Sequence, residues 1–189
     1  MRAALDKLVS LLGLALAVVL VVAGGLLTWG SNFIADEVHT QLAQQNIYFP
    51  PADSPAVAAP EYERMRQYGG MQMTTGAQAE VYANDFIGNH LKKAGGGKTY
   101  AELSTESNAN PDNAELAAQV QTMFRGETLR GLLLNAYAFG TMGTIAGIAA
   151  IGAYVAAGVM LLLALLGFWH AGRVAPAEPQ GRLRESQLA

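Results

Sequence analysis

From Leu132 to Trp169 the chain reads LLLNAYAFGTMGTIAGIAAIGAYVAAGVMLLLALLGFW, a stretch without one charged side chain. The hydrocarbon core of a bilayer is about 30 Å thick, and about 20 helical residues cross it. The stretch is therefore nearly twice as long as one span requires, and no turn or charge divides it into two spans. We predict a transmembrane helix over residues 149–169, preceded by an apolar helical docking segment at the outer leaflet over residues 131–148.

Composition also indicates a membrane protein. Of the 189 residues, 51% are hydrophobic and only 14% are charged, and the apolar residues gather in one block near each end of the chain. The net charge of −3 argues against a nucleic-acid partner, which would select for a basic patch. The absence of cysteine excludes disulfides and thiolate metal sites.

The first apolar block runs from Leu8 to Trp29. A cleaved signal peptide is the competing interpretation, but its apolar region is typically about 7–15 residues long and ends at a small-x-small cleavage site. This block is longer, ends in a tryptophan and shows no clear cleavage site. We predict a retained transmembrane helix over residues 8–29.

The flanking charges predict the orientation of both spans. Arg2 and Lys7 precede the first span, and Arg173 follows the second, whereas Asp36 and Glu37 come just after the first. Because basic residues near the ends of spans remain on the cytoplasmic side, we expect a multi-pass protein of the cell membrane with both termini cytoplasmic. The termini are then residues 1–7 and a disordered tail, residues 170–189.

The central segment, residues 30–130, is then extracytoplasmic. Apolar residues on one helical face predict that the first helix continues through residues 31–45. A helix is also expected over residues 76–93, ended by three glycines, and another begins near Asn113 and runs into the second span. The stretches 52–60 and 104–110 read as an extended Pro/Ala linker and a polar loop.

The expected fold class follows from these elements. It is an all-α membrane protein, in which two transmembrane helices flank a mostly helical, loop-rich extracytoplasmic segment of about 100 residues.

Small residues recur along one face of the long apolar stretch, and Gly143 and Gly147 are in GxxxG register. Small residues let helices approach closely within a bilayer. The partner of this face is either the first span, with its own small residues, or a helix of another protein. The predicted helix-packing interface comprises Gly140, Gly143, Gly147, Ala150 and Ala157.

Three possible chemical sites were weighed against simpler interpretations. The GGGKT stretch at residues 95–99 is not a P-loop, because the position that requires the first glycine holds Lys92. His39 and His90 could meet near Asp36, Glu37 or Asp85, but nothing in their spacing demands a metal site. No nucleophile motif is present. We expect no enzyme activity, no cofactor and no metal.

Three segments carry a family resemblance. They are SNFIADEVHTQLAQQNIYFP (residues 31–50), YANDFIGNHLKKAGGGKTYAEL (82–103) and VQTMFRGETLRGLLLNAYAFG (120–140). In this order, between two apolar spans, they resemble a group of small actinobacterial two-span membrane proteins. Such proteins often carry an aromatic ring-opening dioxygenase label, which this sequence contradicts because such an enzyme needs two histidines and a carboxylate together. The most specific match is Gly97, Lys98, Thr99, Tyr100, Ala101 and Glu102.

The size and layout are also similar to accessory subunits of the actinobacterial respiratory supercomplex, which joins cytochrome bcc to cytochrome oxidase. This resemblance implies a cofactor-free protein that packs against larger membrane subunits, with the lipid bilayer as its other partner. The resulting hypothesis is a non-catalytic accessory or assembly subunit of a membrane complex. The alternative is a stand-alone envelope protein that binds or senses an extracytoplasmic ligand.

Overall fold

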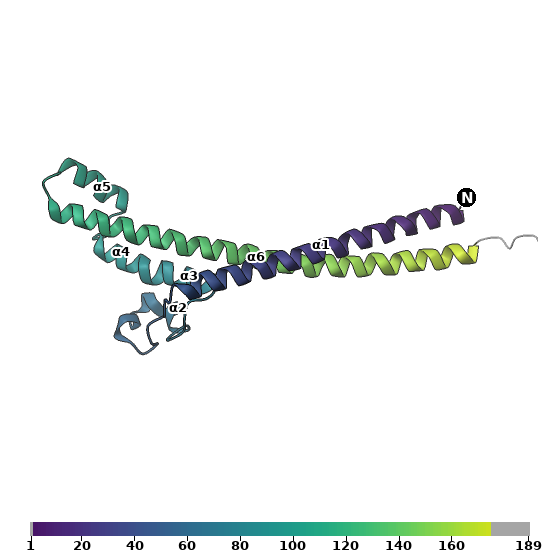
Figure 1. Cartoon of the computed structure of the whole chain (residues 1–189), viewed down its shortest axis with the longest axis horizontal. Helices are drawn as coiled ribbons and strands as arrows, with labels where there is room; N and C mark the ends of the chain where they lie inside the picture. Colours follow the sequence, from purple (N-terminus) through teal and green to yellow (C-terminus); the bar gives the residue numbers. More distant parts are fainter. Residues whose placement is uncertain (1, 175–189) are drawn as a thin grey trace, which may run out of the picture. The chain divides into compact units, whose positions relative to one another are not determined.

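The computed structural model describes residues 2–174, which form helices and no named strand. The chain divides into two compact units. Unit 1 comprises the residues up to Thr28 together with those from Ile148 onward, and unit 2 is Trp29–Gly147. Two long helices, α1 (Arg2–Gln44) and α6 (Ala114–Val174), contribute to both units (Figure 1).

Both α1 and α6 are long and apolar enough to cross a membrane. The core helix of a soluble protein would be mostly buried, but only 17% of the apolar window of each helix is buried here. The described part of the chain is thus all-helical and compatible with a membrane protein. The predicted continuation of the first helix through residues 31–45 is confirmed to within one residue, and so is the unbroken helix from Asn113 into the second apolar block.

In unit 1, α1 and α6 pack antiparallel through small side chains. Gly13 lies against Ala164, and Gly167 lies so close to Ser10 that an added Cβ would displace the Ser10 hydroxyl. A seven-residue repeat of buried alanines, each at most 4% exposed, marks the α6 side of this contact. Such a repeat is typical of left-handed helix packing at a crossing angle of about +20°. The repeat comprises Ala150, Ala157, Ala164 and Ala171.

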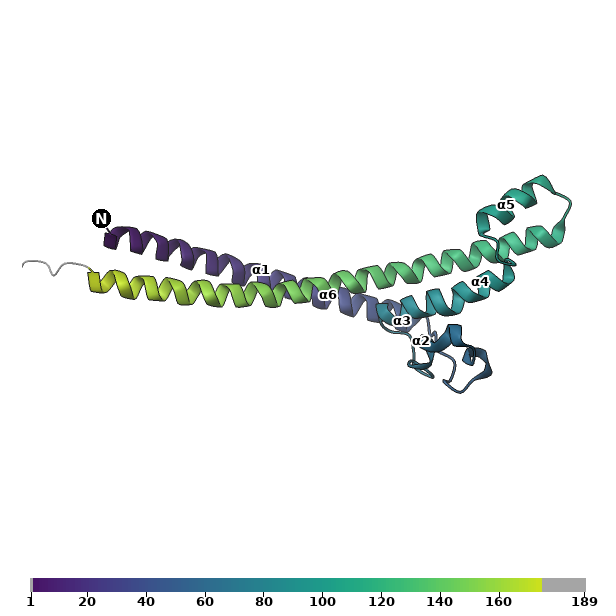
Figure 2. The ribbon, with the colours of Figure 1, turned by 180° about the vertical axis from the view of Figure 1, so that it is seen from behind.

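Unit 2 adds short helical elements to the remaining parts of α1 and α6. Its core contains the fully buried side chains of Leu42, Phe49, Met65, Met73 and Leu103. Figures 1 and 2 agree in placing α5 beside the first turns of α6. The short elements are η1 (Pro55–Val57), η2 (Pro60–Tyr62), α2 (Glu63–Arg66), α3 (Gly76–Val81), the π-helical segment η3 (Tyr82–Ile87), α4 (Gly88–Ala94) and α5 (Tyr100–Ala109).

The helix predicted over residues 76–93 is confirmed as α3, η3 and α4 in direct succession. Thr75 and Gln78 form a capping box at its start. A Cβ atom built on Gly76 would lie 2.9 Å from the carbonyl oxygen of Ala136 and 3.1 Å from the Cα of Tyr137. Only glycine therefore lets α3 begin directly on the backbone of α6.

The predictions of irregular structure for two stretches are wrong. Residues 104–110 are not a loop, because α5 continues to Ala109 and anchors its first turn with the buried Leu103. Residues 52–60 are not uniformly extended. They include η1, in which the Ser54 hydroxyl accepts a hydrogen bond from the amide of Ala56 and Val57 is buried.

The ends of the chain also differ from expectation. Helix α1 already begins at Arg2 rather than Leu8, so part of the predicted cytoplasmic N-terminus is helical. Helix α6 ends at Val174, beyond the expected end of the second span at Trp169. The rest of the predicted tail, residues 175–189, lies outside the described residues.

Substitution of Gly76 tests the contact between α3 and α6. We expect Gly76→Ala to lower the thermal unfolding temperature of the detergent-solubilised protein, because the clashing atoms belong to the α6 backbone and cannot rotate away. The matched control is Gly131→Ala, since a Cβ there meets nothing within 4 Å. Alanine favours a helix over glycine by about 1 kcal/mol, so the control should unfold at or above the wild-type temperature. Equal unfolding temperatures for Gly76→Ala and wild type would contradict this contact.

Candidate functional site

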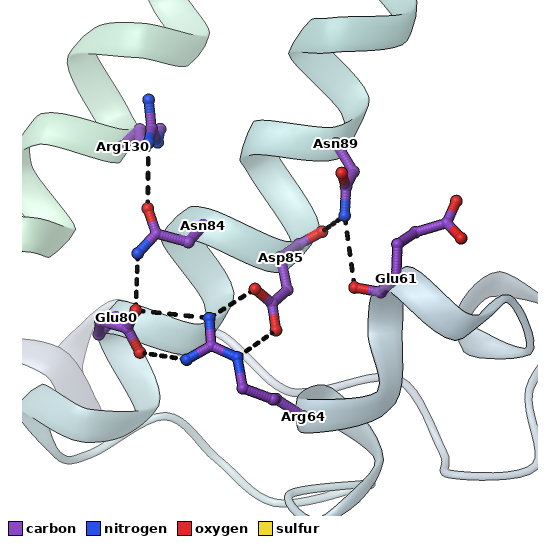
Figure 3. A network of polar contacts seen from close by, with 7 residues as sticks. All are labelled: Glu61, Arg64, Glu80, Asn84, Asp85, Asn89 and Arg130. Carbon is purple, nitrogen blue, oxygen red and sulfur yellow. Dashed lines mark hydrogen bonds and ion pairs between the residues drawn. The ribbon is translucent and has the colours of Figure 1, made fainter.

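A polar network in unit 2 ties α2 to α3 and η3 (Figure 3). The guanidinium of Arg64 donates to Glu80 at 3.0 Å and to Asp85 at 2.6 and 2.9 Å. Hydrogen bonding to these carboxylates, first Asp85 and then Glu80, raises the pKa of Arg64. Every charge in this cluster is paired, so its geometry indicates a clamp between elements.

The network reaches α6 through an amide. Asn84 donates to Glu80 at 2.7 Å and accepts from Arg130 of α6 at 3.1 Å (Figure 3). The Nε of Arg130 is buried and has no hydrogen-bond partner among the described residues. A Cβ built on Gly88 would lie 3.8 Å from that Nε, so the Arg130 side chain passes directly over the helix after the π-helical segment.

His39 and His90, the two histidines of unit 2, have different surroundings. His90 Nδ1 lies 2.7 Å from the carbonyl oxygen of Phe86, and its ring packs against that of Phe86 at a tilt of 51° with centroids 4.4 Å apart. His39 instead lines a surface pocket together with Asp36. Within residues 2–174, no three histidine and carboxylate side chains are placed to hold a metal ion.

Residues 97–102, the most specific part of the sequence resemblance, form the turn before α5 and the first residues of that helix. Gly97 has a φ of 83°, a left-handed conformation that ends the preceding turn after α4. Thr99 and Glu102 form a capping box, with the Glu102 carboxylate accepting from the Thr99 amide at 2.7 Å. This bond lowers the pKa of Glu102. Lys98 pairs with Glu106 at 2.6 Å, and Tyr100 packs on Phe124 of α6.

The predicted helix-packing residues lie against elements of the same chain. In unit 2, Gly143 contacts Ile34, and its carbonyl oxygen accepts a 2.8 Å hydrogen bond from Ser31 of α1. Gly147 also faces Ser31, while Gly140 faces Gly76 of α3. In unit 1, Ala150 and Ala157 are 3% and 4% exposed. The glycine face is thus occupied within the chain, and a partner needs a different surface.

The sequence interpretation missed an apolar groove in unit 2. It has a volume of about 480 Å³ and lies between α1 and α6. Three polar residues of α1, Glu37, Gln41 and Gln45, stand among its lining residues. The apolar residues at helical spacing on α6 were the sequence pattern from which this groove could have been predicted. The apolar lining comprises Phe33, Ile34, Val38, Leu42, Leu129, Leu132, Leu133, Ala136, Phe139 and Met142.

Comparison with protein-family models, curated proteins and solved structures yields no match for this chain. The groove, the capped motif and the polar clamp therefore have to be interpreted from their own geometry.

The capping box at the start of α5 predicts that the stability of this helix depends on pH. The pKa of Glu102 is lowered in the folded state, so its contribution to α5 is present above the ordinary value of 4.5 and is lost as pH falls through the lower, folded-state pKa. We expect hydrogen exchange of the α5 amides to accelerate, relative to its intrinsic pH trend, over that acidic range. The control is Glu102→Gln, which keeps a capping acceptor without a titrating group and should remove this component. An identical pH profile in the variant would refute the assignment.

Proposed function

We propose that this protein is a non-catalytic accessory or assembly subunit of a membrane protein complex. Helices α1 and α6 anchor it in the cell membrane with both termini cytoplasmic, and unit 2 docks on a larger membrane subunit outside. The observation that carries the proposal is the apolar groove of unit 2, which remains open although the glycine face of α6 is already filled.

The residues that line the groove favour a protein, rather than lipid, as the partner that fills it. Phe139 of α6 and Glu37 of α1 line the same groove, and Phe139 is 56% exposed. Hydrocarbon that covered Phe139 would also surround the Glu37 carboxylate, and a charge is costly to place in an apolar medium. A partner helix with an apolar face and polar edges can cover Phe139 while it accommodates the carboxylate.

The proposed complex is respiratory. The size of the chain and its layout of two spans around a central segment, which are similar to accessory subunits of the supercomplex of cytochrome bcc and cytochrome oxidase, support a role in that supercomplex. In that setting the subunit contributes contacts between larger subunits and carries no redox group of its own.

Affinity purification tests this proposal. The full chain is tagged at its C-terminus, expressed in its native host and purified in mild detergent. We expect a stoichiometric membrane partner, and cytochrome absorption bands in the reduced-minus-oxidised visible spectrum. Recovery of the chain alone would refute the subunit proposal, whereas a partner without cytochrome bands would refute the respiratory assignment.

Groove variants test the docking surface. We expect Leu132→Gln and Phe139→Gln to reduce partner recovery several-fold, because both exposed side chains line the groove and glutamine would carry a polar amide into the contact. The matched control is Ala138→Gln, an exposed α6 position outside the groove lining, which should leave recovery unchanged. If all three variants retain the partner equally, the groove is not the docking surface.

A further inference from the structure

A second pocket in unit 2 has mostly apolar walls into which a few polar residues are set. Its volume is about 480 Å³, within the range of about 300–1,000 Å³ typical of small-molecule sites. It opens where α3 begins on α6, at the close contact that Gly76 and Gly140 permit. Helix α1 contributes Asp36 and His39, and neither side chain has a hydrogen bond or ion pair with any residue of the described chain.

The hydroxyl groups around this pocket have already donated their protons. Thr141 and Thr144 donate to carbonyl oxygens of α6 at 2.9 and 3.0 Å. Thr74 and Thr75 donate to the side-chain oxygen of Gln78 at 3.4 and 3.2 Å. A hydroxyl has one proton and two lone pairs. The oxygens of Thr74, Thr141 and Thr144 therefore keep both lone pairs as acceptors, and that of Thr75 keeps one because it already accepts from the Gln78 amide. They lie in the same pocket lining as an unpaired carboxylate.

This acceptor set suits a group that carries a positive charge and several N–H donors. A primary ammonium has three donors and no acceptor, and the ring of Tyr137 in the pocket wall adds an aromatic face that attracts cations. The structure places no cluster of histidines and carboxylates around a metal position within residues 2–174. A single carboxylate beside an aromatic ring therefore suits a singly charged organic ammonium ion better than a multiply charged metal ion.

The position of the pocket along α1 indicates the source of this ammonium. Tryptophan is enriched at the edge of the hydrocarbon core, and Trp29 ends the apolar run of α1. Asp36 lies about 10 Å further along the helix at ~1.5 Å per residue. The headgroup layer on each side of a bilayer is roughly 5–7 Å thick, so Asp36 stands roughly 3–5 Å beyond its outer boundary, close to the ends of the headgroups.

We propose that this pocket binds the primary ammonium of an ethanolamine phospholipid headgroup, with Asp36 as the counter-ion and the threonine oxygens as acceptors. The inference relies on the membrane location proposed above and does not require a partner protein.

The test uses the full chain in nanodiscs and measures its thermal unfolding and, by native mass spectrometry, the lipid it retains. We expect discs that contain phosphatidylethanolamine to stabilise the protein and to leave at least tenfold more lipid bound than phosphatidylcholine discs, because the trimethylated choline nitrogen donates no hydrogen bond. Asp36→Asn should abolish this difference. The matched control is Glu37→Gln, because the adjacent carboxylate lines the apolar groove and bonds to Gln41 instead.

A further arm distinguishes the two sources of the ammonium. Free ethanolamine is titrated into phosphatidylcholine discs with wild type and Asp36→Asn. Stabilisation by the lipid alone supports a headgroup site, whereas Asp36-dependent stabilisation by free ethanolamine supports ammonium recognition but assigns it to a soluble amine. The proposal is overturned if the protein has the same unfolding temperature and retains the same amount of lipid in all discs. It is also overturned if a difference between the discs persists in Asp36→Asn. Because no partner is present, this result is independent of the affinity purification.

Discussion

The close antiparallel contact between α1 and α6 is the interaction on which both units depend. In unit 1 the contact is made by glycine, serine and alanine, as at Gly13 with Ala164 and Ser10 with Gly167. Large apolar side chains then point outward, and they would be an unfavourable surface in water. In unit 2 the same pairing continues where Ser31 bonds to the Gly143 carbonyl. Between helices in lipid, small residues are what permit such van der Waals contact and backbone hydrogen bonding.

The remaining elements of unit 2 attach to this helix pair by two different means. Glycine permits direct backbone contact, as Gly76 does where α3 begins on α6. Charge and amide groups then connect the short elements, because Arg64 joins α2 to Glu80 and Asp85. The consequence is that polar groups of the π-helical segment are used within the fold, and the surfaces left open include the apolar groove and the pocket beside the start of α3.

The reliability of the sequence interpretation differed between regular and irregular stretches. Residues 76–93 were predictable because the apolar spacing and the following glycines indicate the same helix. The polar stretch 104–110 was misread as a loop, because its composition lacks an apolar periodicity. Helix α5 forms there nevertheless, since a capping box starts it and Leu103 is buried against the core.

The sequence by itself determined the two long apolar helices and the small-residue face of α6. The helical spacing of small residues and the apolar composition are local properties of one chain segment. Only the tertiary structure decided what that face contacts. Gly143 and Gly147 meet Ser31 of the same chain, since α1 and α6 lie antiparallel in a register that no local pattern specifies. That register also decided which side chains remain exposed. It leaves Phe139 in an open groove and Asp36 beside four threonines, because both surfaces are assembled from residues distant in the sequence.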